Sequence, residues 1–355
     1  MHKTELKYLA DPTLEWLKQS FDACEGKGSA AWYSRLRRPL NGWSEAYPET
    51  TGYIIETLLD YHEICQECWM KNYALAAADW LVSIQKPDGS FPAGLGTKGS
   101  PSVFNSGMIL FGLERSFVFT GDEKYFDAAK KTADWLCGNL DLEGKWTSGA
   151  YVEGYVPSYY SRVIWAVLLL NRHNRNQDTE RKMNLAYNFY CDKFEDKNAD
   201  WDWSFAPGKP AFTHTIAYTM RGFLESATLL KDSRGLQIAK DIAEQFINEL
   251  QKNGDVAGSY DEDFKGDYSF VCVTGNAQLS INFYRLFQLT GEEKYKMFSK
   301  RLFETVREAP SRIPISGLRG GIPGSFPIIG KYMPLQRVNW GAKFWLDAAR
   351  LVSES

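Results

Sequence analysis

The chain of 355 residues carries a formal net charge of −3 at pH 7, with 41 Lys and Arg against 44 Asp and Glu. This near balance gives no general basic field, so the sequence argues against a nucleic-acid partner. No run approaches the ~20 apolar residues of a membrane helix, and the opening MHKTELKYLADP lacks the apolar stretch of a signal peptide. We therefore expect no membrane span and a cytoplasmic location.

Six cysteines are scattered mostly through segments with a helical pattern, which is typical of reduced core thiols. The one CxxC, from Cys65 to Cys68, has no second pair of ligands nearby, and the chain has only four histidines. A GxGxxG phosphate fingerprint is also absent. We predict no metal site and no cofactor.

One pattern recurs six times: a loop rich in Gly, aromatic and polar residues leads into an apolar helix whose first turn carries polar groups. The six entrances are YPETTG (47–52), FNSG (104–107), SYYSR (158–162), FTHT (212–215), VTGN (273–276) and VNWG (338–341). They follow one another at intervals of roughly 54 to 66 residues, long enough for two helices of about four turns and two loops. The pattern predicts a repeat of helical hairpins.

Between the entrances lie segments in which apolar residues recur at intervals of three and four, as in amphipathic outer helices. These segments are 13–23, 73–84, 123–140, 181–194, 234–250 and 293–307. Two of them begin alike, with TGDEKY at 120–125 and TGEEKY at 290–295, where Thr or Asp can cap the helix. Six inner and six outer helices give a prediction of twelve.

The loop after an outer helix repeats a Gly-x-aromatic pattern, in DGSF (88–91), EGKW (143–146) and GSY (258–260), with DWDW (200–203) in the expected place between them. The last inner segment, 340–351, is as apolar as the others, whereas an open solenoid needs polar caps at both ends. We therefore predict a closed ring, an all-α (α/α)6 barrel that forms a single domain over residues 1–355.

This pattern resembles the α/α toroid shared by six-hairpin glycosidases, several polysaccharide lyases and, with related repeats, terpenoid cyclases and prenyltransferases. YPETTG at 47–52 and GGIPGS at 320–325 also resemble features of uncharacterised six-hairpin proteins associated with bacterial exopolysaccharide synthesis. The resemblance implies a setting in polysaccharide metabolism and supplies no mechanism.

A terpenoid cyclase is the alternative from another chemical class, because WLVSIQKPDGSF at 80–91 is similar to the QW repeat of squalene-type cyclases. Such enzymes resemble this chain in their repeats but need a DxDD acid motif or a DDxxD-like metal motif, and neither is present. We instead expect Gln85 to bond backbone groups and to fasten an outer helix to the next loop.

Aromatic residues make up 15% of the chain, and many of them lie in loops beside Gly, Pro or charged residues. Flat rings beside hydrogen-bonding groups suit a sugar, because a pyranose ring has apolar faces and hydroxyls at its edge. The predicted sugar-binding residues are Trp43, Tyr47, Phe91, Trp146, Tyr159, Trp201, Trp203, Tyr260 and Tyr332, with Arg162 and Arg319 for an acidic group.

In a closed ring with parallel inner helices, all six inner N-termini lie at one end, where their partial positive charges favour an anionic ligand such as a uronic acid. Glu49 begins the first inner helix, and there the helix N-terminus should lower its pKa and suit it to act as a base or nucleophile. Glu45 is one candidate acid partner in such a hydrolase, and the sequence does not choose the pair from a pool that also contains Asp88, Asp202, Asp261 and Asp267.

A lyase or epimerase acting on a uronic acid is the second possibility, with Tyr159 or Tyr160 or His214 as base and Asn105 and Arg162 stabilising the enolate-like charge. Asn105, Tyr160 and His214 occupy the same position in three successive hairpins. Hydrolase, lyase or epimerase, and glycan-binding protein without chemistry all remain open from the sequence.

Overall fold

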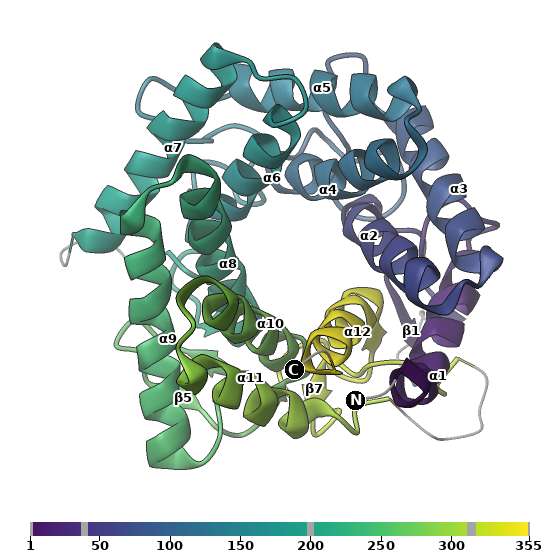
Figure 1. Ribbon diagram of the computed structural model, residues 1–355, viewed down its shortest axis with the longest axis vertical. Helices are drawn as coiled ribbons and strands as arrows, with labels where there is room; N and C mark the ends of the chain where they lie inside the picture. Colours follow the sequence, from purple (N-terminus) through teal and green to yellow (C-terminus); the bar gives the residue numbers. More distant parts are fainter. Residues whose placement is uncertain (1–2, 37–41, 197–201, 311–316, 354–355) are drawn as a thin grey trace.

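The computed structural model describes residues 3–36, 42–196, 202–310 and 317–353, and twelve α-helices arranged as a double ring are found in this part of the chain (Figure 1). The inner helices are α2 (Pro48–Cys65), α4 (Val103–Thr120), α6 (Ser161–Asn171), α8 (Thr213–Leu230), α10 (Val273–Thr290) and α12 (Asn339–Ser353). The outer helices are α1 (Lys3–Asp22), α3 (Cys68–Ile84), α5 (Glu123–Gly138), α7 (Gln177–Glu195), α9 (Ser233–Asn253) and α11 (Glu293–Val306).

Each inner helix packs against the next one in sequence, and α12 packs against α2 to close the ring. The outer partner of α12 is α1, so the sixth hairpin is built from both ends of the chain (Figure 1). The predicted all-α barrel of six hairpins is confirmed. The predicted bounds hold within a few residues except for α1, which begins at Lys3 and contains Pro12.

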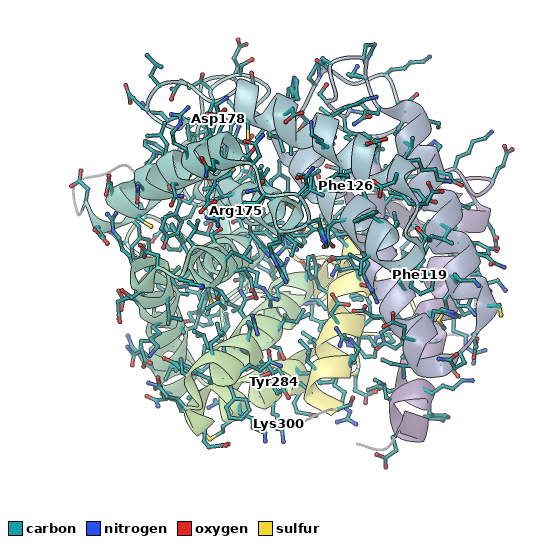
Figure 2. All side chains as sticks on the ribbon, turned by 45° about the horizontal axis from the view of Figure 1, so that its top comes forward. Phe119, Phe126, Arg175, Asp178, Tyr284 and Lys300 are labelled. Carbon is teal, nitrogen blue, oxygen red and sulfur yellow. The ribbon has the colours of Figure 1, made fainter. Side chains whose placement is uncertain are left out.

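The two layers differ in composition for a simple reason. Inner helices touch neighbours on all sides, so residues 103–114 of α4 are buried without a break. Outer helices bury one stripe and carry charged side chains on the other, as at Arg175 and Asp178 where α7 begins (Figure 2). None of the described helices is long and apolar enough to cross a membrane.

Short antiparallel strands lie directly before several inner helices and fix where those helices start. They form three small sheets: β1 (Trp32–Ser34) between β2 (Gly42–Trp43) and β8 (Arg337–Val338); β4 (Ser259–Tyr260) between β3 (Ala211–Phe212) and β5 (Gly266–Asp267); and β6 (Val271–Cys272) with β7 (Ser325–Phe326). Strand β3 leads into α8, β6 into α10 and β8 into α12. The first turns of these helices are therefore held in place by backbone pairing.

Gln85 behaves as the sequence suggested. Its side-chain amide donates to the carbonyl oxygens of Ala128 (2.8 Å) and Gly89 (3.2 Å) and to the hydroxyl of Thr132 (2.9 Å). It thereby ties the end of α3 to the neighbouring outer helix α5, which confirms its predicted role as a fastener between an outer helix and a loop.

Helices α2 and α4 approach each other through glycines. A Cβ atom built on Gly112 would lie 2.1 Å from the carbonyl oxygen of Gly52, and one built on Gly52 would lie 2.5 Å from the Cα atom of Ile109. Any side chain at either position would push two inner helices apart.

We expect Gly112→Ala to lower the free energy of unfolding by about 1–3 kcal/mol, as overpacking in a core does. Gly138→Ala is the matched control, because Gly138 is the exposed last residue of α5 and a Cβ there meets nothing within 4 Å. Urea unfolding of both variants measures the difference. Equal stability of the two variants would show that the inner ring is not closely packed at this point.

Candidate active site

The first turns of the inner helices meet at one end of the ring, which we call the N-terminal mouth and define by Tyr47, Glu49, His214 and Tyr332. Tyr47 precedes α2, and Pro48 occupies its first turn, where the missing N–H costs nothing. The Tyr47 hydroxyl donates a hydrogen bond of 2.5 Å to Oε2 of Glu49. Glu49 itself is buried, with 8% of its surface exposed.

Burial raises the pKa of Glu49 to about 7, against the opposing effects of the Tyr47 hydrogen bond and the positive charge of Arg162. The expectation that the helix N-terminus would leave Glu49 with a lowered pKa is therefore wrong, because loss of hydration outweighs the helix dipole at a buried carboxyl. At neutral pH a large fraction of Glu49 is protonated. The group is suited to give a proton rather than to take one.

His214 lies in the first turn of α8 and is also buried. Its Nδ1 pairs with Oε1 of Gln278 at 2.9 Å, and its ring centroid lies 4.4 Å from that of Tyr218 and 5.4 Å from that of Tyr332. Burial lowers the pKa of His214 to about 3, although the Gln278 hydrogen bond favours the charged form. The imidazole is neutral over the physiological range.

Two tyrosines that the sequence analysis did not single out complete the mouth. Tyr53 and Tyr218 follow Glu49 and His214 by one helical turn, on the same faces of α2 and α8. The Tyr218 hydroxyl donates to the Tyr53 hydroxyl at 3.4 Å. Burial and then the Glu49 charge raise the pKa of Tyr218 above its usual range. Their spacing of four residues from polar first-turn residues was the signal that could have found them.

Arg162 lies deeper in the ring. Its guanidinium carbon lies 4.9–5.6 Å from the ring centroids of Phe111, Trp165, Tyr218 and Phe344, and its Nε donates to the Met108 sulfur at 3.3 Å. Among the described residues it forms no ion pair with a carboxylate. A buried cation held by aromatic faces keeps its hydrogen-bonding edge available for an anion.

Asn105, Tyr159 and Tyr160 lie at the same end, but the polar atoms of two of them are bonded within the fold. The Asn105 amide donates to the carbonyl oxygen of Pro92 (2.8 Å), and the Tyr160 hydroxyl accepts from the backbone N–H of Tyr151 (3.3 Å). Burial raises the pKa of both tyrosines. A tyrosine that resists ionisation in this way is a poor proton acceptor.

The Gly-x-aromatic loops point their rings inward. Phe91 and Trp146 are fully buried, and the Trp146 indole donates to the carbonyl oxygen of Leu136 at 2.9 Å. Tyr260 stacks on Phe264, with ring centroids 4.3 Å apart. In this structure Phe91 and Trp146 offer no surface to a sugar, because glycine turns the chain and the following ring fills the space between the helical layers.

The remaining predicted residues lie away from Glu49 or outside the described residues. Trp43 packs against Trp16 at 4.9 Å, and Trp203 packs against Phe194 at 5.6 Å. Glu45 and Arg319 are exposed, and Trp201 lies outside the described residues. The structure thus brings together Tyr47, Glu49, Arg162, His214 and Tyr332, and their roles stay predictions.

A cluster of aromatic side chains around Phe205, and a groove beside it, adjoin the N-terminal mouth. The ring centroid of Phe205 lies 6.5 Å from that of Tyr151, 6.4 Å from that of Phe212 and 6.1 Å from that of His214. Beside Phe205 and Phe212 lies a cavity of about 630 Å³. It is also bordered by Tyr260, Asp261 and Asp267 and by three lysines, Lys209, Lys265 and Lys331. No group of three or more His, Cys, Asp or Glu suited to a metal occurs in the described residues.

The raised pKa of Glu49 predicts a pH-dependent stability. Between the ordinary value of 4.5 and about 7, the folded protein binds more protons than the unfolded chain, so stability falls as the pH rises through this window. Glu49→Gln removes the effect. We expect the free energy of unfolding of the variant, relative to the wild type, to rise across the window by up to about 3 kcal/mol.

Urea unfolding at several pH values from about 4.5 to about 8 measures this difference, with Glu45→Gln as the solvent-exposed control. A difference between Glu49→Gln and the wild type that does not change with pH would contradict the raised pKa.

No family model matches the chain, and no curated protein matches it. Solved structures match it over nearly its whole length. An unsaturated glucuronyl hydrolase specific for heparin is 14% identical with a TM-score of 0.75, and the match covers 99% of this chain and 98% of that one.

A second unsaturated glucuronyl hydrolase, from Bacillus sp. GL1 and responsible for the degradation of glycosaminoglycan, is 13% identical with a TM-score of 0.73, covering 97% and 96% of the two chains. An alpha-amylase from Clostridium perfringens is 10% identical with a TM-score of 0.69, covering 97% of each chain. At these identities the likeness concerns the fold alone: the chain is an α/α toroid of six helical hairpins.

Proposed function

We propose that this protein is a carbohydrate-active enzyme that acts on an acidic oligosaccharide at the N-terminal mouth, with Glu49 as the proton donor. The observation that carries the proposal is a carboxyl buried in the first turn of an inner helix, with its pKa raised to about 7, hydrogen-bonded to the Tyr47 hydroxyl and close to Arg162. A general acid works best when its pKa lies near the operating pH.

The number of carboxyl groups favours one kind of reaction. Ordinary glycoside hydrolysis uses two carboxyl groups on either side of the bond. In the first turns of the described inner helices, Glu49 is the one carboxyl residue, and Glu45 before α2 is exposed. A substrate whose reaction needs one carboxyl group, which first gives a proton and then takes one back from water, suits this mouth better.

An unsaturated uronyl group is such a substrate, and two of the similar structures are unsaturated glucuronyl hydrolases. The group is an enol ether. Proton transfer from the Glu49 carboxyl to the double bond would give an oxocarbenium ion, water would add to it with loss of a proton, and the resulting hemiketal would open and release the alcohol. The Glu49 carboxylate left behind is stabilised by the Tyr47 hydroxyl.

Recognition of the acidic group follows from the charges around Glu49. Arg162 supplies a cation without a carboxylate partner among the described residues, and the first turns of the inner helices add partial positive charge. The groove beside Phe205 and Phe212 carries three lysines against two aspartates, which suits the rest of an acidic chain. Polysaccharide biosynthesis as the setting stays a prediction from the sequence resemblance.

We expect the protein to decrease the ultraviolet absorbance of an unsaturated uronyl disaccharide, because hydration destroys the conjugated double bond. Glu49→Gln should lower kcat by roughly 100-fold or more, since a positioned general acid contributes at least that much. Glu45→Gln is the matched control and should retain activity, because Glu45 is an exposed carboxylate four residues earlier.

Three other results would each reject this proposal. Equal losses in Glu45→Gln and Glu49→Gln would indicate a pair of carboxyl groups. A rise in absorbance from an intact acidic polysaccharide, abolished by His214→Ala, would indicate a lyase. Retained binding of acidic oligosaccharides with no change in absorbance or reducing ends would indicate a glycan-binding protein.

A further inference from the structure

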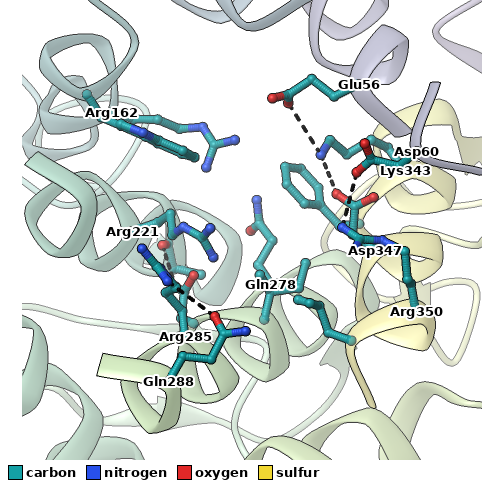
Figure 3. Close-up of a pocket in the computed structure, with 16 residues that line it drawn as sticks. Glu56, Asp60, Arg162, Arg221, Gln278, Arg285, Gln288, Lys343, Asp347 and Arg350 are labelled. Atoms are coloured by element: carbon teal, nitrogen blue, oxygen red, sulfur yellow. Dashed lines mark hydrogen bonds and ion pairs between the residues drawn. The ribbon is translucent and has the colours of Figure 1, made fainter. Parts of the chain in front are cut away.

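A second cavity, of about 190 Å³, lies between the inner helices (Figure 3). Gln278, which pairs with His214 of the N-terminal mouth, is one of its lining residues. Residues from α2, α6, α8, α10 and α12 line it, and Gln288 and Arg350 near the C-terminal ends of α10 and α12 are among them. The cavity lies inside the ring, yet charged side chains provide much of its lining. Charged side chains inside the ring lose hydration, which is costly unless each charge has a partner.

One side of this cavity is an arginine wall, which we define as Arg162, Arg221 and Arg285 (Figure 3). Arg221 and Arg285 share one carboxylate, that of Glu225: Nη2 of Arg221 and Nε of Arg285 each lie 2.9 Å from its Oε1. Arg162 is held by aromatic rings instead. Three cations thus face the cavity with one neutralising group.

On the opposite wall, the acidic side chains are paired with cationic ones. Its three acids, Glu56, Asp60 and Asp347, lie across the cavity from the arginines (Figure 3). Lys343 contacts Asp347 and lies 3.9 Å from Glu56. Arg350 and Arg115 each approach Asp60 to 3.1 Å. These acids thus have cationic partners of their own, and burial raises the pKa of Glu56 to about 7, so that this carboxyl is partly protonated at neutral pH. They offset the charge of the arginine wall only in part.

Hydrogen-bond donors on the arginine wall are also unused. Nε and Nη1 of Arg221 are buried without a hydrogen-bond partner. Arg162 donates its Nε to the Met108 sulfur, and its guanidinium points into the cavity (Figure 3). Buried guanidinium donors are normally hydrogen-bonded, since a buried donor without an acceptor destabilises the folded state. An anion in the cavity would pair with the Arg162 guanidinium and offset the charge of the arginine wall.

We propose that this cavity is a second ligand site that binds a small oxyanion, such as a carboxylate, sulfate or phosphate group, on the arginine wall. Planar guanidinium groups match the oxygen geometry of all three. The site uses side chains that the proposed reaction at Glu49 does not require, with the exception of Arg162. Its occupation does not depend on the proposed function being correct.

Titration calorimetry on the full chain, at constant ionic strength, tests the site with three probes: inorganic phosphate, sulfate and glucuronate. We expect at least one probe to bind and Arg285→Gln to weaken it by roughly 10- to 100-fold, the effect of losing a charge-assisted hydrogen bond. Arg181→Gln is the matched control, because Arg181 is an exposed arginine paired with Asp178 on α7. This variant should bind the probe as tightly as the wild type does.

A second readout does not depend on altering an arginine. Trp165 lines the cavity, with the guanidinium groups of Arg162 and Arg221 5.0 and 5.2 Å from its ring. A bound anion should change its fluorescence, and Trp165→Phe should abolish that change. If phosphate or sulfate binds alone, the ligand is a tetrahedral anion; if glucuronate binds as well, the site accepts an acidic sugar.

Binding of the probe should survive in Glu49→Gln, which separates this site from the N-terminal mouth. Absence of binding by all three probes, binding that Arg285→Gln leaves unchanged, or a fluorescence change that persists in Trp165→Phe would overturn the proposal. So would binding that Glu49→Gln abolishes and Arg285→Gln does not.

Discussion

The contact between α12 and α2 holds the ring closed, and both helices line the second cavity. Across this contact the Asn339 amide donates to the Thr50 hydroxyl (2.9 Å), the Thr57 hydroxyl donates to Asp347 (2.8 Å), and the Tyr61 hydroxyl donates to the carbonyl oxygen of Leu346 (2.9 Å). The contact is therefore polar along its length, unlike the approach of α2 to α4 through glycines. Asp347 takes part in both features. It accepts the hydrogen bond from Thr57 that helps to close the ring, and it lines the wall of the second cavity opposite the arginines.

The two ends of the ring differ in how their charge is compensated. At the N-terminal mouth a carboxyl group is deprived of water and held largely protonated, whereas the second cavity keeps guanidinium groups that are short of anions. Arg162 connects the two regions, since its charge lowers the pKa of Glu49 while its side chain lines the second cavity. An anion beside Arg162 would weaken that effect and favour the protonated form of Glu49 further.

The repeat predicted the fold because hairpin spacing, amphipathic outer segments and entrance loops are local properties of the sequence. The site was predicted only in part. Glu49 and His214 stand out as polar residues at helix entrances, but the sequence does not say whether a nearby ring faces a ligand or the core. Phe91 and Trp146 share a loop pattern that suggested a sugar platform, and both are packed between the helical layers. Arg221 and Arg285 were overlooked because they lie on two different inner helices far from the entrance loops, and only the closed ring places them on one wall.

The pairing of α1 with α12 has a consequence for how the chain folds. The indole of Trp16 in α1 donates to the carbonyl oxygen of Gly317, 301 positions later, and Leu17 and Phe21 of the same helix are fully buried. During synthesis α1 emerges before the other described helices, while its hairpin partner α12 emerges after them. Five hairpins can form from neighbouring segments, but the sixth requires both ends of the chain to meet at the cost of a large loop-closure entropy. The ring can therefore be completed only after α12 has been synthesised, and until then the apolar stripe of α1, which includes Trp16, Leu17 and Phe21, has no partner on α12.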